Sequence, residues 1–436
     1  MKKKIISILL ILISFFAVVY PYSSFANSEN LELHADSYLL MDKASKKVLY
    51  EKNGYEKMFP ASTTKVMTAI LTLENCSLTD TATVSYYAVH SVPDTYSIVN
   101  LVPGEKILIR DLLYSLMVAS ANDSAFVLAE YIANNGNNYA IDSTEDTKNK
   151  FNKSIEIFSD MMNKKALEYG CKNTNFVNPN GIQNDNHYST AYDLALIAYN
   201  AIKDDTITKI VNIKDYSIAN SDLYQGEPRV FKNTNSLLNP SSPAYYEYAN
   251  GLKTGYTDAA QYCLIATATK DNSTLIAVVL HSPSGSNYAI SREKDCKTLF
   301  EYGFNYFKEL ALIEKNGIVT SLKIFNGTDE SKNLNLIAKD GLYALLEKNK
   351  VIDISPIITI NKHLAPIAKN EVVGTATYTI DDVQYVTDLI AEHDVYPNNY
   401  LIFILILIIV FIIALIVLFI IIKTNSKNDH SPYVFK

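Results

Sequence analysis

Cysteine, glycine and proline are all scarce in this chain of 436 residues, and no charge sign dominates. Fourteen glycines and 13 prolines exclude a collagen-like or low-complexity protein. A net charge of −7 gives no basic excess, so nucleic acid is not expected as a partner. The four cysteines contain no C-x-x-C pair, so we expect buried free thiols rather than a zinc or redox site. With 48% hydrophobic residues the chain is not globally disordered, and its length predicts two or three domains.

The N-terminal end is far more apolar than the middle of the chain. Three lysines follow Met1, an apolar run covers Ile5 to Tyr20, and Ser24 and Ala26 are small residues at the −3 and −1 positions of a cleavage site. This pattern predicts a secretory signal peptide, and an uncleaved membrane anchor is the alternative. Either way, the body of the protein is expected to be exported.

The C-terminal end contains a second apolar run, Leu401–Ile422, with no charge and no proline. As a helix it would extend roughly 33 Å, which is enough to cross the hydrocarbon core of a bilayer. Lys423 and Lys427 follow it, so the positive-inside rule places residues 423–436 in the cytoplasm. The sequence therefore predicts a cell-membrane protein with a single C-terminal span and an extracytoplasmic catalytic part.

Between the two apolar ends, the pattern of helix-like and strand-like segments changes once. Helical periodicity and strand-like runs mix up to about residue 310, with helices expected at 62–74, 111–133, 151–169, 191–202 and 291–309 and a hairpin at 263–281. Short β-rich runs separated by turns then fill 317–395. These patterns predict an α+β domain followed by a small all-β domain. The expected segments are a signal peptide at 1–26, a catalytic domain at 27–312, a β-sandwich at 313–396, a transmembrane anchor at 397–422 and a cytoplasmic tail at 423–436.

An S-x-x-K pattern opens the helix expected at 62–74. Ser62 and Lys65 are three residues apart, so their side chains emerge on one helix face. A serine needs an adjacent base to become a nucleophile, and a lysine is such a base only when burial or another cation lowers its pKa. The pattern alone is weak, because Ser291 and Lys294 repeat it by chance.

Two further short patterns carry polar residues. Ser120 and Asn122 form an S-x-N pattern in the helix expected at 111–133, where an ordinary buried hydrogen-bonded pair is the alternative. Lys253, Thr254 and Gly255 precede the expected hairpin, where a strand with a glycine leaves room for a ligand and a surface turn is the alternative.

The order of the three patterns is more informative than any one of them. S-x-x-K, S-x-N and K-T-G, in this order along the chain, are the signature of active-serine penicillin-recognising enzymes. The chain resembles the low-molecular-weight penicillin-binding proteins that are D-alanyl-D-alanine carboxypeptidases. Several further segments are similar to that family: 101–105, 120–123, 176–179, 187–191, 233–235, 251–257 and 302–304. Gln261 departs from it, because the family usually has glycine there, and we expect altered strand packing near the cleft.

The resemblance implies a penicillin-recognising transpeptidase/β-lactamase-like domain and catalytic roles for four residues. Ser62 would attack the carbonyl of the penultimate D-alanine, and Lys65 would accept its proton. Lys253 would keep Lys65 neutral by like-charge repulsion. Ser120 would relay a proton to the departing D-alanine.

The resemblance also implies how the substrate is held. Asn122 would hold the peptide backbone, and Thr254 and Arg292 would bind the terminal carboxylate, with a solvated helix residue as the alternative for Arg292. Gly255 would leave room for the ligand on the strand. The backbone N–H groups of Ser62 and Tyr256 would form the oxyanion hole.

The expected partners are a peptidoglycan stem peptide ending in D-Ala-D-Ala, β-lactams as covalent inhibitors, and the membrane through residues 401–422. No metal or organic cofactor is implied, and His187 is interpreted as structural. A class A β-lactamase is one alternative, although Glu227-Pro228 lacks the expected asparagine three residues after the proline. A D,D-endopeptidase and a non-catalytic wall-binding protein are the others.

Overall fold

A computed structural model describes residues 31–428 except for five short gaps, at 138–140, 222, 272, 285–289 and 349–353. The expected signal peptide at 1–26 and residues 429–436 of the expected tail lie outside the described residues. The chain divides into two compact units, with the division between Phe307 and Lys308. Each unit is described by itself.

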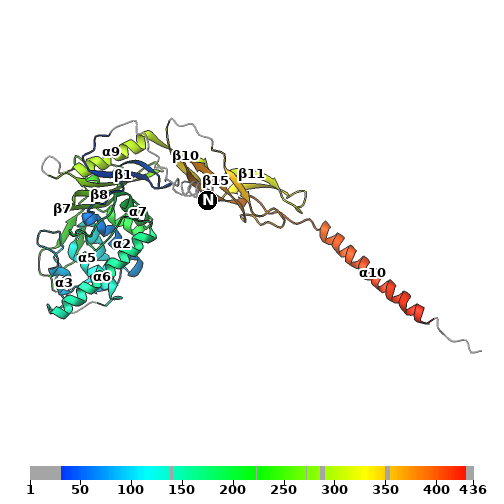
Figure 1. Ribbon diagram of the computed structural model, residues 1–436, viewed down its shortest axis with the longest axis horizontal. Coiled ribbons are helices and arrows are strands. Elements are labelled where there is room, and N and C mark those ends of the chain that lie inside the picture. Colours follow the sequence, from blue (N-terminus) through cyan, green and yellow to red (C-terminus); the bar gives the residue numbers. More distant parts are fainter. Residues whose placement is uncertain are drawn as a thin grey trace, which may run out of the picture. The chain divides into compact units, whose positions relative to one another are not determined.

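The first unit is built on a five-stranded antiparallel sheet. Its strand order is β2 (Val48–Lys52), β1 (Ser37–Asp42), β9 (Ser273–Ser282), β8 (Gln261–Lys270) and β7 (Ala249–Thr257). The central strands are buried almost throughout, because α9 (Ser291–Tyr306) covers one face and α7 (Ala191–Ala201) covers the other (Figure 1). The hairpin of β8 and β9 agrees with the one expected at 263–281.

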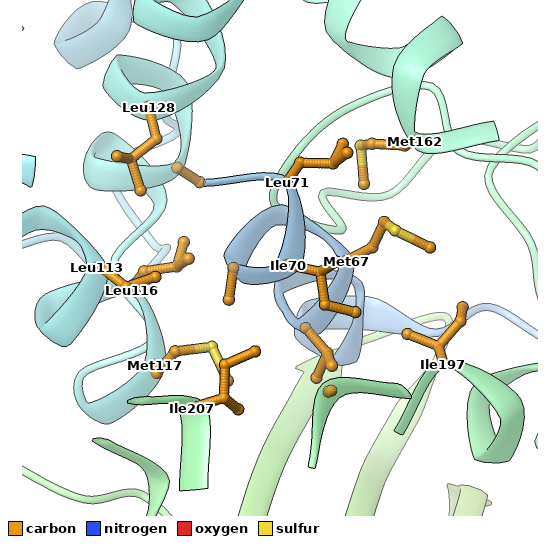
Figure 2. Packing of buried hydrophobic residues seen from close by; sticks show 14 of the residues in the cluster. Met67, Ile70, Leu71, Leu113, Leu116, Met117, Leu128, Met162, Ile197 and Ile207 are labelled. Atoms are coloured by element: carbon orange, nitrogen blue, oxygen red, sulfur yellow. The ribbon is translucent and has the colours of Figure 1, made fainter. Parts of the chain in front are cut away.

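A second layer of helices packs around α2 (Lys65–Asn75), whose residues are buried on every side from Lys65 to Thr72. Figure 2 shows Met67, Ile70 and Leu71 of α2 surrounded by apolar side chains of neighbouring helices. These helices are α4 (Ile109–Val118), α5 (Asn122–Ala133), α6 (Glu145–Glu168), α7 and α8 (Asp205–Val211). A helix enclosed in this way has little freedom to shift, so the residues at its N-terminal end are held in place.

The helix expected at 111–133 is wrong in one respect, because the structure divides it into α4 and α5. The break lies at Ser120, whose φ of 60° is in the left-handed region that serine rarely adopts. The apolar periodicity continues across the break, which is why it reads as one helix. The consequence is functional: Ser120 lies in a turn, and Asn122 is the first residue of α5.

The remaining elements of the first unit are short. They are β3 (Thr81–Thr83), α3 (Tyr86–His90), β4 (Lys106–Leu108), β5 (Asp215–Ile218), β6 (Arg229–Lys232) and the 3-10 helices η1 (Ala61–Thr64) and η2 (Ser236–Leu238). β3 pairs with β4, and β5 pairs with β6.

The second unit contains the all-β domain. Helix α9 ends at Tyr306, three residues before its expected end, and the chain continues as strand β10 (Phe307–Ile313). β10 pairs with β13 (Leu342–Glu347), and a five-stranded antiparallel sheet has the order β11 (Ile318–Lys323), β12 (Asn333–Ala338), β16 (Val383–Ala391), β15 (Val372–Ile380) and β14 (Ile357–Ile360). Side chains of both sheets share one apolar core.

The last element is helix α10 (Tyr400–Asn428). Its segment Phe403–Lys423 has 21 residues and is long and apolar enough to cross a membrane, with a mean hydropathy of 4.0 over an 18-residue stretch. The α+β domain, the all-β domain and the single apolar C-terminal helix are the architecture expected from the sequence.

Candidate active site

A cavity of about 460 Å³ lies where the helical layer meets the edge of the sheet at β7. Seven of the nine expected site residues line it: Ser62, Ser120, Asn122, Thr254, Gly255, Tyr256 and Arg292. The other two, Lys65 and Lys253, are buried behind its wall. The three short patterns, far apart in the sequence, therefore meet in one place.

The backbone at Ser62 is held by two glycines. Ser62 lies in η1, which continues directly into α2. Gly181 has a φ of +82°, and a Cβ atom there would lie 1.8 Å from the carbonyl oxygen of Ala61. A Cβ atom on Gly255 of β7 would lie 3.0 Å from the backbone nitrogen of Ser62. Only glycine permits these approaches, so both positions set where the Ser62 backbone lies relative to β7.

Lys65 is fully buried and has three polar neighbours. Its Nζ atom lies 2.8 Å from Ser62 Oγ, 2.9 Å from Asn122 Oδ1 and 2.7 Å from the carbonyl oxygen of Asn180. Burial, and next the charge of Lys253, lower the pKa of Lys65 well below its usual value, which favours the neutral amine.

The geometry fixes how a neutral Lys65 would use its hydrogen atoms. A neutral amine has two N–H donors and one lone pair, and Asn180 offers only a carbonyl oxygen. Asn122 Nδ2 donates to the carbonyl oxygen of Ser97 at 2.9 Å, so Asn122 must turn its oxygen toward Lys65. Both donors of Lys65 are then committed to oxygens that only accept. The lone pair is left facing the hydroxyl of Ser62, as a general base requires.

Lys253 is the second buried amine of the site. Its Nζ atom donates to the carbonyl oxygen of Thr254 at 3.0 Å. Burial, followed by the charge of Arg292, lowers the pKa of Lys253 to about 7. Arg292, Lys253 and Lys65 thus form a series in which each cation lowers the pKa of the next amine toward Ser62.

The turn at Ser120 and the loop before it form the wall opposite β7. Asn122 N and Nδ2 both donate to the carbonyl oxygen of Ser97, each at 2.9 Å. The buried carboxylate of Asp123 accepts from the backbone N–H groups of Val99 and Leu101. These bonds attach the loop that carries Thr95, Tyr96 and Ser97 to the start of α5, next to Ser120.

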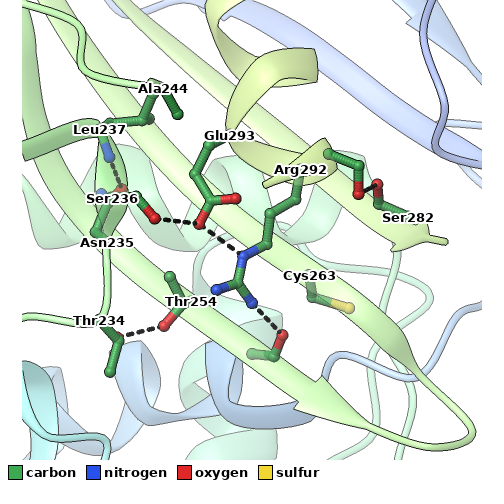
Figure 3. A network of polar contacts seen from close by, with 12 residues as sticks. Thr234, Asn235, Ser236, Leu237, Ala244, Thr254, Cys263, Ser282, Arg292 and Glu293 are labelled. Atoms are coloured by element: carbon green, nitrogen blue, oxygen red, sulfur yellow. Dashed lines mark hydrogen bonds and ion pairs between the residues drawn. The ribbon is translucent and has the colours of Figure 1, made fainter. Parts of the chain in front are cut away.

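Arg292 belongs to a network of polar contacts between α9 and β7 (Figure 3). Its Nη1 atom donates to the carbonyl oxygen of Gly255 at 2.9 Å, and its Nε atom donates to Glu293 Oε1 at 2.9 Å. Ser236 Oγ donates to the same oxygen of Glu293 at 3.3 Å. The carboxylate of Glu293 is fully buried, so the guanidinium of Arg292 is oriented toward the cavity by a charge that does not reach solvent.

Thr254 is coupled to a residue outside the three patterns, Thr234, whose hydroxyl lies 2.5 Å from that of Thr254. Thr234, Asn180 and Glu293 are the site residues that sequence reasoning did not single out. Thr234 and the residues beside Asn180 lie in segments similar to the family, but a carbonyl contact leaves no trace in residue type.

His187 lies behind the site rather than in it. Its Nδ1 atom accepts from the backbone N–H of Val177 at 3.1 Å, so the proton is on Nε2 and is donated to Thr64 Oγ1 at 2.8 Å. Burial, and next Lys65, lower the pKa of His187 to about 3. A permanently neutral ring beside η1 agrees with the structural interpretation.

Gln261 has a φ of 52°, a conformation that suits the glycine usual in the family. Its side chain bridges the mouth of the hairpin: Nε2 donates to the carbonyl oxygen of Asp258, and Oε1 accepts from the N–H of Ser284. Strand β8 starts there and pairs with β7 through Tyr262 and Cys263. Strand β8 also pairs with β9, with a register shift between Tyr262 and Leu264, next to Gln261. The altered strand packing expected near the cleft stays a prediction.

Neither a disulfide nor a metal-binding cluster is found among the described residues. All four cysteines are free thiols, and Cys171, Cys263 and Cys296 are buried. In the described part of the chain no group of three histidine, cysteine, aspartate or glutamate residues is arranged to hold a metal ion.

Comparisons with known proteins decide the family. Residues 24–284 match the family model described as D-alanyl-D-alanine carboxypeptidase, peptidase family S11. The chain belongs to this family. It is a serine-type D,D-carboxypeptidase of the low-molecular-weight penicillin-binding proteins. Residues 307–397 match the C-terminal domain of penicillin-binding protein 5.

Individual relatives of this D,D-carboxypeptidase support the same family assignment, and they cover between 64% and 92% of its chain. It is 30% identical to D-alanyl-D-alanine carboxypeptidase DacF of Bacillus subtilis over 92% of this chain and 97% of that protein. The crystal structure of penicillin-binding protein 5 from Haemophilus influenzae is 28% identical, with a TM-score of 0.63 over 84% of this chain and 99% of that one. The Streptomyces K15 DD-transpeptidase is 33% identical, with a TM-score of 0.54 over 64% of this chain and 99% of that one.

Proposed function

We propose that the carboxypeptidase acts through an acyl-enzyme on Ser62. The Lys65 lone pair removes the hydroxyl proton as Ser62 Oγ attacks the carbonyl carbon of the penultimate D-alanine in a stem peptide ending in D-Ala-D-Ala. The observation that carries this proposal is the 2.8 Å distance between Lys65 Nζ and Ser62 Oγ, with both Lys65 donors directed to other oxygens. The backbone N–H groups of Ser62 and Tyr256 stabilise the developing oxyanion, and each such donor is worth about 3 kcal/mol in the barrier.

The C–N bond to the terminal D-alanine then breaks. The leaving amine needs a proton, and Ser120, which lines the same cavity, relays it from Lys65. Asn122 holds the backbone of the peptide. Thr254 and Arg292 bind the carboxylate of the terminal D-alanine, because the hydroxyl of Thr254 and the oriented guanidinium of Arg292 both line the cavity.

Water completes the cycle by hydrolysing the ester on Ser62. A β-lactam carries a carbonyl and a carboxylate in a similar arrangement, so it acylates Ser62 and leaves an ester that hydrolyses slowly. Glu227, the carboxylate considered for a β-lactamase, does not line the cavity. This placement supports slow rather than fast turnover of penicillin.

The proposed location follows from α10 and the apolar N-terminal end. The segment Phe403–Lys423 crosses the cell membrane once, with the catalytic unit on the extracytoplasmic side and the C-terminal tail in the cytoplasm. There the enzyme meets peptidoglycan, whose stem peptides are its proposed substrate.

The test of the proposal is Ser62→Ala. We expect release of D-alanine from a peptide ending in D-Ala-D-Ala to fall by about 10⁴-fold or more, and labelling by a fluorescent penicillin to disappear. The matched control is Ser291→Ala, which removes the serine of the second S-x-x-K match, on α9. Labelling of Ser62→Ala at the wild-type rate would remove Ser62 from its role.

A further inference from the structure

Three large apolar side chains stand exposed at one end of the all-β domain. Phe325 is 67% exposed, Tyr396 is 61% exposed and Leu364 is 49% exposed. Phe325 and Leu364 form an isolated parallel bridge, and Gly327 bridges to Pro397, so the three lie on neighbouring segments. We call these three residues the apolar tip.

The core of the domain fixes the outward direction of the tip. Each tip residue has a chain neighbour that inserts into the core: Ile324 beside Phe325, Ala365 beside Leu364 and Val395 beside Tyr396. Successive side chains of extended backbone point in opposite directions, so burial of one member of each pair turns the other outward. The exposure is therefore built into the fold of the domain.

The tip is attached to the beginning of the apolar helix. The N–H of Thr328 donates to the carbonyl oxygen of Tyr396 at 3.0 Å, and the N–H of Asn398 donates to the carbonyl oxygen of Asn326 at 2.7 Å. Helix α10 begins two residues later, at Tyr400. The all-β domain therefore holds the chain up to the residue before the helix cap.

The short connection limits the distance from the tip to the bilayer. Phe403, where the apolar span begins, is five residues after Asn398. Five residues extend at most about 18 Å even when fully stretched. Part of this segment is helical, so the true reach is shorter, while the polar layer of a bilayer adds roughly 5–8 Å on each side of the hydrocarbon.

We propose that the apolar tip is seated in the headgroup layer of the membrane that α10 crosses. The inference rests on the proposed anchoring by α10. Tyrosine favours this layer because it combines an apolar ring with a polar hydroxyl, and exposed phenylalanine and leucine side chains bury at the boundary between headgroups and acyl chains. Tyr396 and Tyr400 follow the same rule at the entry of the span. The all-β domain would thus have two attachments to the bilayer, the helix and the tip, rather than one tether.

The test uses the absence of tryptophan from the chain. Phe325→Trp places the chain's single tryptophan at the tip, where it can be excited at wavelengths that the 31 tyrosines do not absorb, and Tyr396→Trp is a second reporter. The matched control is Ile318→Trp, because Ile318 is 56% exposed and lies at the start of β11, roughly 23 Å along the chain from Phe325. Each full-length variant is reconstituted into phosphatidylcholine vesicles with or without bromine on the acyl chains near the headgroup.

The expected result is a blue shift and loss of most of the emission in brominated vesicles at positions 325 and 396, with no change at position 318. If the protein floats with the vesicles but the tryptophan at position 325 is not quenched, the proposed seating of the tip is refuted, while anchoring by α10 is retained. A blue shift without bromine quenching shows that another protein surface covers the tip, which also overturns the proposal. Quenching at all three positions shows a domain lying flat on the bilayer and contradicts a seated tip. Protein that does not float with vesicles overturns the anchoring, and the tip with it.

Discussion

Replacing Asn122 by aspartate tests the proposed state of Lys65 directly. Asn122 Oδ1 lies 2.9 Å from Lys65 Nζ, and the variant puts a carboxylate oxygen in that place. Two unit charges at this distance attract each other by about 6 kcal/mol at an effective dielectric constant of 20. Desolvation of the new carboxylate offsets part of this energy. If one quarter remains, about 1.4 kcal/mol, the pKa of Lys65 rises by about one unit, and the neutral fraction falls about tenfold at every pH below the pKa.

The assay is the pH dependence of kcat/KM for release of D-alanine. In the wild type the rate rises with pH as Lys65 loses its proton, and burial keeps that pKa low. Asn122→Asp raises the pKa of Lys65, so we expect the rising limb to be displaced by about one pH unit to higher pH, with about a tenfold loss at each pH on that limb. Asn122→Ala removes the same hydrogen bond without adding charge, and its limb should stay in place. An unchanged limb in Asn122→Asp would refute the assignment of Lys65 as the neutral base.

Three other variants test neighbouring parts of the account. Glu293→Leu removes the carboxylate that orients the guanidinium of Arg292. KM for a peptide with a free terminal carboxylate should then rise about tenfold, with kcat little changed. KM for the same peptide with an amidated C-terminus should stay the same. Gly181→Ala should lower the free energy of unfolding by about 2–4 kcal/mol in denaturant titrations, because its Cβ would meet Ala61 O. The folded pKa of Lys253 is about 7, so the unfolded chain binds more protons above that pH and wild-type stability rises with pH. Lys253→Met should remove about 2 kcal/mol of this rise between pH 7 and 9, and an equal rise in both proteins would contradict the burial argument.

Residue type and order predicted the parts of this molecule whose chemistry is carried by side chains. Ser62 and Lys65 are three residues apart, and the start of a helix was enough to place their side chains together. The hairpin of β8 and β9 and the strands of the all-β domain followed from alternation and turn residues. The apolar run at 401–422 predicted α10 by its length and by its lack of charge and proline.

The parts that could not be predicted depend on backbone rather than on side-chain identity. No residue pattern announces a φ of 60° at Ser120, because the apolar face of α4 continues into α5 as if one helix ran through. Lys65 is held by the carbonyl oxygen of Asn180, and any residue there would offer the same group. Glu293 matters because it is buried beside Arg292, and burial of one glutamate in a polar helix has no local signature.

Mass spectrometry of the protein after exposure to benzylpenicillin tests the central claim most directly. The account predicts a single covalent adduct on the peptide that contains Ser62, persisting long after free penicillin is removed. An adduct on another residue, or rapid loss of the adduct with turnover of penicillin, would contradict it.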